Sequence, residues 1–163
     1  MKSSLLMNFS VDKEKSKIKV EREFAAPVTK VWSAFTESEI LDKWWAPKPW
    51  KARTKTMDFR EGGYWLYAMV GPDGTEHWAR ADFQSITPLK NYTAKDNFCD
   101  SDGNPTNTIA SAEWNNSFSE TGEMTLVSIE VQFEKLEDLE AHIEMGFKEG
   151  FTAAMENLDE LFQ

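Results

Sequence analysis

The chain has 163 residues, of which 40% are apolar and 13% aromatic. This composition is typical of one globular domain, because a disordered chain lacks the apolar area that offsets its ordering entropy. The formal charge of −10 disfavours nucleic-acid binding, since phosphate groups would repel the chain. Cys99 is the one cysteine, which excludes an internal disulfide and fits a reducing, cytoplasmic compartment.

The chain is expected to begin with a partly disordered lead-in over residues 1–15, followed by a single domain over residues 16–163. The apolar patch at residues 5–9 is shorter than a signal-peptide core and far shorter than a membrane span. Export and membrane insertion are therefore not expected. Apolar residues alternate over 16–24, and Pro27 ends this first strand.

Helical spacing of apolar residues begins at Val28 and predicts two short helices joined near Thr36. Pro47 and Pro49 then break the helical pattern. The following segments alternate with a period of two and are separated by glycine-containing turns, which is typical of antiparallel strands. Seven strands are predicted, at residues 16–24, 50–59, 64–70, 76–86, 91–98, 108–118 and 123–133.

The period becomes helical again at Leu136 and predicts one C-terminal helix of about 26 residues. Gly146 and Gly150 lie on one face of this helix, which suggests close approach by a strand or a ligand. The order of elements excludes a doubly wound α/β fold and an all-β barrel. It predicts an α+β helix-grip fold, in which a curved seven-stranded antiparallel sheet wraps around the long C-terminal helix.

A series of short motifs runs along most of the chain. They are Pro27, Val31-Trp32, Trp44-Trp45-Ala46-Pro47, Asp58-Phe59-Arg60-Glu61-Gly62-Gly63, Met69, Pro72-Asp73-Gly74, Ile86-Thr87-Pro88, Thr125-Leu126, Phe133, Gly146 and Gly150. Together they resemble the heat-shock-protein-90 ATPase activator homologue family, within the START-like SRPBCC superfamily. The resemblance covers all but roughly the first 15 residues. It implies a helix-grip fold with a cavity between sheet and helix, in a family largely without assigned catalysis.

Signatures of catalytic or metal chemistry are sparse. His77 and His142 lie on different elements without metal-ligand spacing, so both are interpreted as solvated or hydrogen-bonded surface histidines. Neither a metal nor a cofactor is expected. The strand carboxylates Asp82, Glu113 and Glu130 could hide an acid/base pair, but positions on the solvent-facing side of the sheet are favoured.

The many aromatic residues suit either the walls of a ligand cavity or a core that fills this space. Arg80 is the candidate polar anchor, because a guanidinium buried in the cavity would require an anionic partner. The candidate cavity-lining residues are Trp44, Trp45, Trp65, Tyr67, Met69, Phe83, Trp114, Phe147 and Phe151.

Three functions remain open from the sequence. The first hypothesis is a START-like module that binds a small hydrophobic or amphipathic ligand in the cavity. The second is a co-chaperone-type interaction protein that activates the heat-shock chaperone ATPase. The third is a cyclase-like or hydrolytic enzyme that uses an acid/base pair in the cavity. A monomer and a homodimer are both compatible with the sequence.

Overall fold

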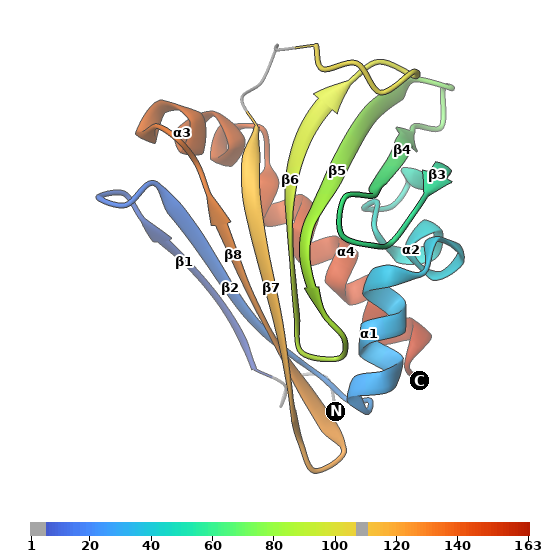
Figure 1. Ribbon diagram of the computed structural model, residues 1–163, viewed down its shortest axis with the longest axis vertical. Helices are drawn as coiled ribbons and strands as arrows, with labels where there is room; N and C mark the ends of the chain where they lie inside the picture. The colour runs from blue at the N-terminus through green and yellow to red at the C-terminus, as the bar shows by residue number, and fades with distance from the viewer. Residues whose placement is uncertain (1–5, 107–110) are drawn as a thin grey trace.

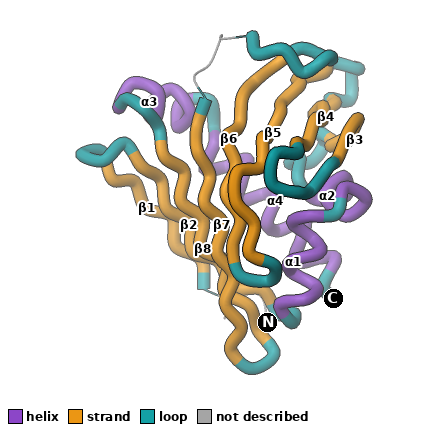
Figure 2. The backbone as a smooth tube through the Cα atoms, in the orientation of Figure 1, coloured by secondary structure: helices purple, strands orange, loops and turns teal. Residues whose placement is uncertain are grey.

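A computed structural model describes residues 6–106 and 111–163. One curved antiparallel sheet of eight strands carries the helices on its concave side (Figures 1 and 2). The strands lie in the order β1-β2-β8-β7-β6-β5-β4-β3. They are β1 (Met7–Asp12), β2 (Lys17–Phe24), β3 (Lys51–Met57), β4 (Tyr64–Val70), β5 (Glu76–Thr87), β6 (Asn91–Cys99), β7 (Ala112–Thr121) and β8 (Met124–Gln132). The helices are α1 (Val28–Thr36), α2 (Ser38–Trp44), α3 (Leu136–Glu144) and α4 (Phe147–Leu161).

The sheet has one strand more than predicted. The additional strand, β1, comes from the segment 1–15, where only a lead-in was expected, and it pairs with β2 along its whole length. Its sequence alternates between apolar and polar residues, but Met7 and Phe9 are only half-buried and Val11 is exposed. Residues 1–5, and the predicted strand start at residues 108–110, lie outside the described residues.

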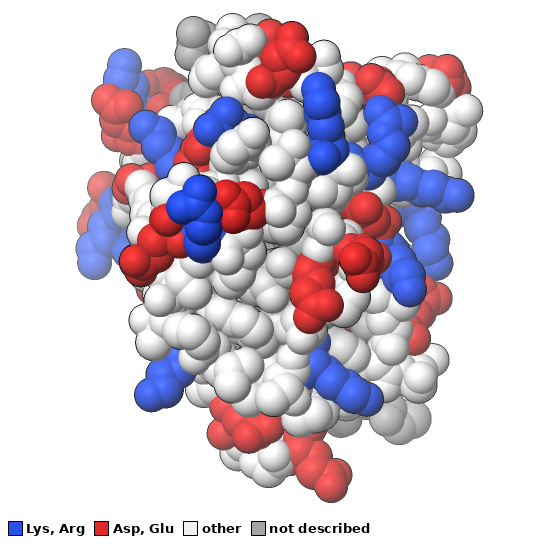
Figure 3. Space-filling model, turned by 45° about the vertical axis from the view of Figure 1, so that its right-hand side comes forward, with Lys and Arg blue, Asp and Glu red and all other residues white. Residues whose placement is uncertain are grey.

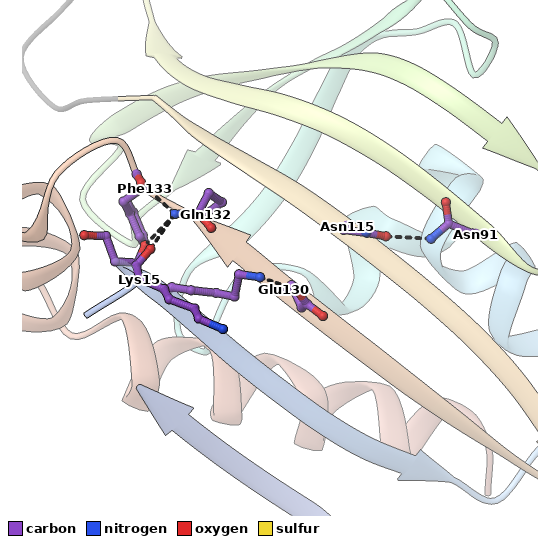
Figure 4. Close-up of polar contacts among 8 residues, drawn as sticks. Lys15, Asn91, Asn115, Glu130, Gln132 and Phe133 are labelled. Atoms are coloured by element: carbon purple, nitrogen blue, oxygen red, sulfur yellow. Dashed lines mark hydrogen bonds and ion pairs between the residues drawn. The ribbon is translucent and has the colours of Figure 1, made fainter. Parts of the chain in front are cut away.

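Polar contacts on the sheet fasten the β1–β2 hairpin to β8 (Figure 4). The Gln132 side-chain amide donates hydrogen bonds to the carbonyl oxygens of Lys15 and Ser16, at 2.7 and 3.2 Å. Lys17 Nζ lies 2.8 Å from Glu130 Oε1 on the neighbouring strand. These contacts link residues more than a hundred positions apart and position the edge of the sheet.

The C-terminal helical segment is two helices rather than the single long one predicted. The break lies at Gly146, whose φ of +92° is the left-handed conformation that glycine adopts without a steric penalty. A β-carbon at Gly150 would meet Pro47 Cγ at 3.8 Å, which is ordinary contact. The predicted close approach therefore explains neither glycine: Gly146 is required by the turn, and Gly150 has room for a β-carbon.

Helix α4 packs against the concave face of the sheet and closes one contiguous core. Met155 and Leu158 of α4 are fully buried, as are Val127 and Ile129 of β8. A buried ion pair between Arg22 of β2 and Asp159 of α4 adds a polar link between the two layers. The fold class is thus confirmed, with the helix gripped by the curved sheet as predicted.

The outer surface carries side chains of both charges, interleaved with broad uncharged areas on the face shown in Figure 3. Within the described part of the chain, no helix combines the length and apolar character needed to cross a bilayer.

Candidate functional site

A cavity of about 220 Å³ lies between the concave side of β4–β8 and the helical segment α3–α4. Its walls are mainly apolar, and side chains from five strands and both helices contribute to them. The structure brings six of the nine predicted lining residues together here, namely Trp45, Tyr67, Met69, Trp114, Phe147 and Phe151.

The other three predicted lining residues belong to the packed core. Trp44 is completely buried, and its indole N–H donates to the carbonyl of Ala34 at 2.8 Å. Trp65 is buried in the core and stacks on the cavity residue Tyr67, with 3.9 Å between the ring centres. Phe83 packs edge-on against the rings of Phe59 and Tyr92. Part of the aromatic surplus therefore fills the core, and part lines the cavity.

The aromatic wall is centred on Trp45, which follows α2. Its ring lies 6.0 Å from Trp114 and 5.8 Å from Phe151, centre to centre. Phe147 and Phe151, one helical turn apart on α4, stack at 5.5 Å. The indole N–H of Trp45 also donates to the hydroxyl oxygen of Tyr67 at 2.9 Å. Mutual packing and this hydrogen bond fix the rings, so the cavity is preformed.

Asp96 of β6 places a carboxyl group in this apolar wall. The residue is half-buried with its side chain at the cavity, and burial raises the pKa of the carboxyl to about 7. The backbone N–H of Ala112 donates to Oδ1 at 3.2 Å. The indole N–H of Trp114 lies close enough to lower this pKa, yet it makes no hydrogen bond of regular geometry.

Sequence reasoning missed Asp96, although a signal was present. Tyr92, Ala94, Asp96 and Phe98 alternate along β6 and share its inner face, so the pattern itself places a carboxylate toward the core. The prediction from the sequence named Asp82, Glu113 and Glu130 instead. Only the cross-strand neighbours reveal that this side chain ends in a cavity rather than in packed apolar atoms.

Tyr67 provides a second polar group in the wall. Its hydroxyl accepts a hydrogen bond from Trp45, and burial raises the pKa of the phenol. Within residues 6–106 and 111–163, no acceptor for the proton of this hydroxyl is found. The hydroxyl can therefore serve a bound molecule as a donor, and its oxygen retains a further lone pair.

A family model described as "Activator of Hsp90 ATPase homolog 1-like protein" matches residues 25–163. The chain belongs to this family. Its fold is shared by the crystal structure of a protein from Mycobacterium smegmatis (26% identity, TM-score 0.89, covering 98% of this chain and 97% of that one). The solution structure of a protein from Arthrobacter aurescens is also similar (30% identity, TM-score 0.88, covering 93% and 88%). No match to a curated protein was found.

The resemblance inferred from the motifs is thus confirmed, while the family description assigns no ligand. A more distant solution structure, from Staphylococcus epidermidis, shows the same fold at 24% identity with a TM-score of 0.82 (covering 93% of this chain and 92% of that one). The chemistry of this family member has to be argued from its own cavity residues.

Both histidines border the cavity, although they lie on different elements. His142 of α3 is buried, so its interpretation as a surface residue is wrong. Its Nδ1–H donates to the carbonyl oxygen of Asp138 at 2.9 Å, which leaves Nε2 of the neutral ring as an acceptor. His77 of β5 is exposed and stacks on Trp50 at 5.3 Å. Among the described residues, no group of three or more potential metal ligands is found.

The predicted polar anchor lies outside the cavity. Arg80 points to the opposite side of β5 from the cavity residue Ala79, pairs with Asp82 at 2.9 Å and covers the ring of Tyr64. The carboxylates singled out from the sequence are also outside the cavity. They are Asp82, paired with Arg80; Glu130, whose pKa is lowered by Lys17; and the exposed Glu113.

Proposed function

We propose that the protein binds a small, largely apolar molecule with one polar group in the cavity between the sheet and α3–α4. The observation that carries the proposal is an aromatic cavity in whose wall Asp96 is the one carboxyl group among the described lining residues. An apolar pocket with a few convergent polar groups is the usual form of a small-molecule site.

The size and lining of the cavity support this proposal. The cavity opens to solvent on one side, and its mainly apolar walls favour the exchange of water for an apolar molecule. A dry cavity of about 150 Å³ holds benzene, so one aromatic ring with a short substituent matches the cavity of about 220 Å³.

Native mass spectrometry of the purified protein tests the proposal directly, by detecting a co-purified molecule. Thermal unfolding with a library of small aromatic and aliphatic compounds tests it independently, because a ligand of the folded state raises Tm. Ala79→Phe should fill the cavity and abolish the rise in Tm. Ala141→Phe, at an exposed position of α3, should leave it unchanged. The absence of both a bound mass and any Tm shift would refute the proposal.

Family membership supports a second candidate, a co-chaperone that stimulates the heat-shock chaperone ATPase. Its test is the ATPase rate of the purified chaperone with and without this protein. If the cavity variant Ala79→Phe stimulates the rate as well as the wild type does, the two functions are separate.

Asp96 also supports the cyclase-like or hydrolytic alternative, since a general base works best when its pKa lies near the operating pH. The same native mass spectrometry experiment distinguishes this alternative. Incubation of the protein with its co-purified molecule at neutral pH should change the mass of that molecule if the protein is an enzyme, and leave it unchanged if the protein is a binding module.

A further inference from the structure

We infer that the cavity recognises an organic cation, an ammonium group on an apolar body, held by Asp96 and the surrounding aromatic rings. This inference rests on the proposed function, because it names the ligand class of the same cavity. Four features carry it: an unpaired carboxyl, an aromatic cage, a set of hydrogen-bond acceptors and the charge of the whole chain.

The carboxyl of Asp96 has no cationic partner among the described residues. The described residues that line the cavity include no lysine or arginine. The ion pairs found in the described part of the chain involve other carboxylates. A buried carboxylate is normally paired, because an isolated charge in an apolar environment is costly. The missing positive charge is therefore one that a ligand can supply.

Aromatic rings surround the space in front of this carboxyl. Trp45 and Trp114 supply two indole rings, and Tyr67, Phe147 and Phe151 complete the wall. The rings lie close to one another, for example with 5.7 Å between the centres of Trp114 and Phe151. The negative faces of such rings attract ammonium ions, and the attraction is strongest where water is excluded.

Several polar atoms of the cavity can accept hydrogen bonds from a ligand, and the Tyr67 hydroxyl can also donate one. The N–H groups of Ala112 and Trp114 are both near Asp96 and support its ionised form. His142 uses its Nδ1–H on a backbone carbonyl, and the Tyr67 oxygen retains a lone pair. A ligand that donates N–H groups and carries positive charge complements the carboxyl of Asp96 and these acceptors. The net charge of −10 also attracts cations to the protein.

Protonation of Asp96 gives the inference a measurable signature. Burial raises its pKa to about 7, so in mildly acidic solution the free protein holds a proton that a bound cation must displace. The affinity for a permanent cation should fall by up to about tenfold for each pH unit below this pKa and level off above it. The other titratable groups facing the cavity are Tyr67 of β4, His77 of β5 and His142 of α3.

Two matched probes separate charge from shape. Phenethylamine and phenethyl alcohol share one aromatic skeleton and differ in the ammonium and hydroxyl groups. By isothermal titration calorimetry near pH 8, the amine should bind at least about tenfold more tightly, from cation–π attraction and a charge-assisted hydrogen bond. Asp96→Asn should reduce this preference to the smaller part that cation–π attraction supplies, while Glu113→Gln, on the exposed side of β7, should retain it in full.

A permanent cation keeps the inference testable if Asp96→Asn does not fold. Benzyltrimethylammonium cannot exchange a proton itself, so its binding to the wild type below about pH 7 should release up to about one proton from the protein. Calorimetry in buffers of different ionisation enthalpy measures this release. Near pH 8.5 the release should disappear.

Each outcome separates the inference from the function on which it rests. Equal affinity for the amine and the alcohol, or no proton release, would overturn the cation inference and leave a neutral-ligand cavity in place. A preference for the amine that is undiminished in Asp96→Asn would also overturn it, because Asp96 would then play no part in recognising the charge. Failure of both probes and of the whole compound library would instead refute the proposed function.

Discussion

Replacement of Asp96 by asparagine should change the pH dependence of stability in an unusual direction. Most native carboxyl groups have a lowered pKa, so they lose stabilising interactions as the pH falls. Asp96 is the opposite case, since burial raises its pKa from the ordinary value of 3.8 to about 7. Between these two values the folded protein holds a proton that the unfolded chain has released. Stability therefore falls as the pH rises through this window.

The size of the effect follows from the two pKa values. A difference of roughly three pH units corresponds to an upper limit of about 4 kcal/mol in the free energy of unfolding. Between pH 5 and pH 7.5, the wild type should lose about 2.5 kcal/mol relative to Asp96→Asn. The amide oxygen introduced by this substitution can still accept from the N–H of Ala112, so the changed slope arises from the lost ionisation.

Urea denaturation of both proteins across this pH range measures the effect. The difference between the two free energies of unfolding removes the contributions of other titratable groups, which the two proteins share. The lowered carboxyl pKa values of Asp73 and Glu76 affect stability at more acidic pH, and this effect also cancels in the difference. A wild-type-minus-variant difference that stays constant from pH 5 to pH 7.5 would show that Asp96 is not a buried ionisable group.

Two further predictions concern the helical layer. Asp159→Asn should cost about 3–5 kcal/mol in urea denaturation, because Arg22 would remain buried without its partner. Glu140→Gln, in a largely exposed pair with Lys13, should cost less than about 1 kcal/mol, and equal costs would contradict this view. Gly146→Ala should lower stability by about 1–2 kcal/mol, whereas Gly150→Ala should raise it by up to about 1 kcal/mol. Thermal unfolding shifts of the same sign would contradict the assigned roles of the glycines.

The sequence determined most of the fold because alternation and helical spacing are local signals. The clean period of two in β8 and the apolar stripe of α4 both appear in the structure as buried faces. The β1 strand was missed although Met7, Phe9 and Val11 alternate with polar residues, because the apolar residues at 5–9 were interpreted as a short patch within a disordered lead-in. The helix break at Gly146 was missed because glycine inside a helical pattern is compatible both with a continuous helix and with a left-handed turn.

The set of cavity-lining residues was predicted less completely than the fold, because it depends on which aromatic rings meet across the sheet. Trp44 and Trp45 are adjacent in sequence, yet one is locked in the core and the other forms the cavity wall. Arg80 and Asp96 show the same limit for polar groups. Arg80, the predicted anchor, lies outside the cavity. Asp96 lines the cavity and pairs across strands with Ala81, fifteen positions earlier in the sequence.

The break at Gly146 also explains why a cavity exists at this end of the sheet. A continuous helix from α3 into α4 would keep one straight apolar stripe, whereas the left-handed turn redirects the chain between His142 and Phe147. Both of these side chains then border the same space, and Gly150 adds no side chain to fill it. The helix interruption that weakens local secondary structure thus leaves room beside Asp96. The turn at Gly146 therefore produces both a site for a ligand and a cost in stability. A molecule that occupies the cavity should raise the free energy of unfolding.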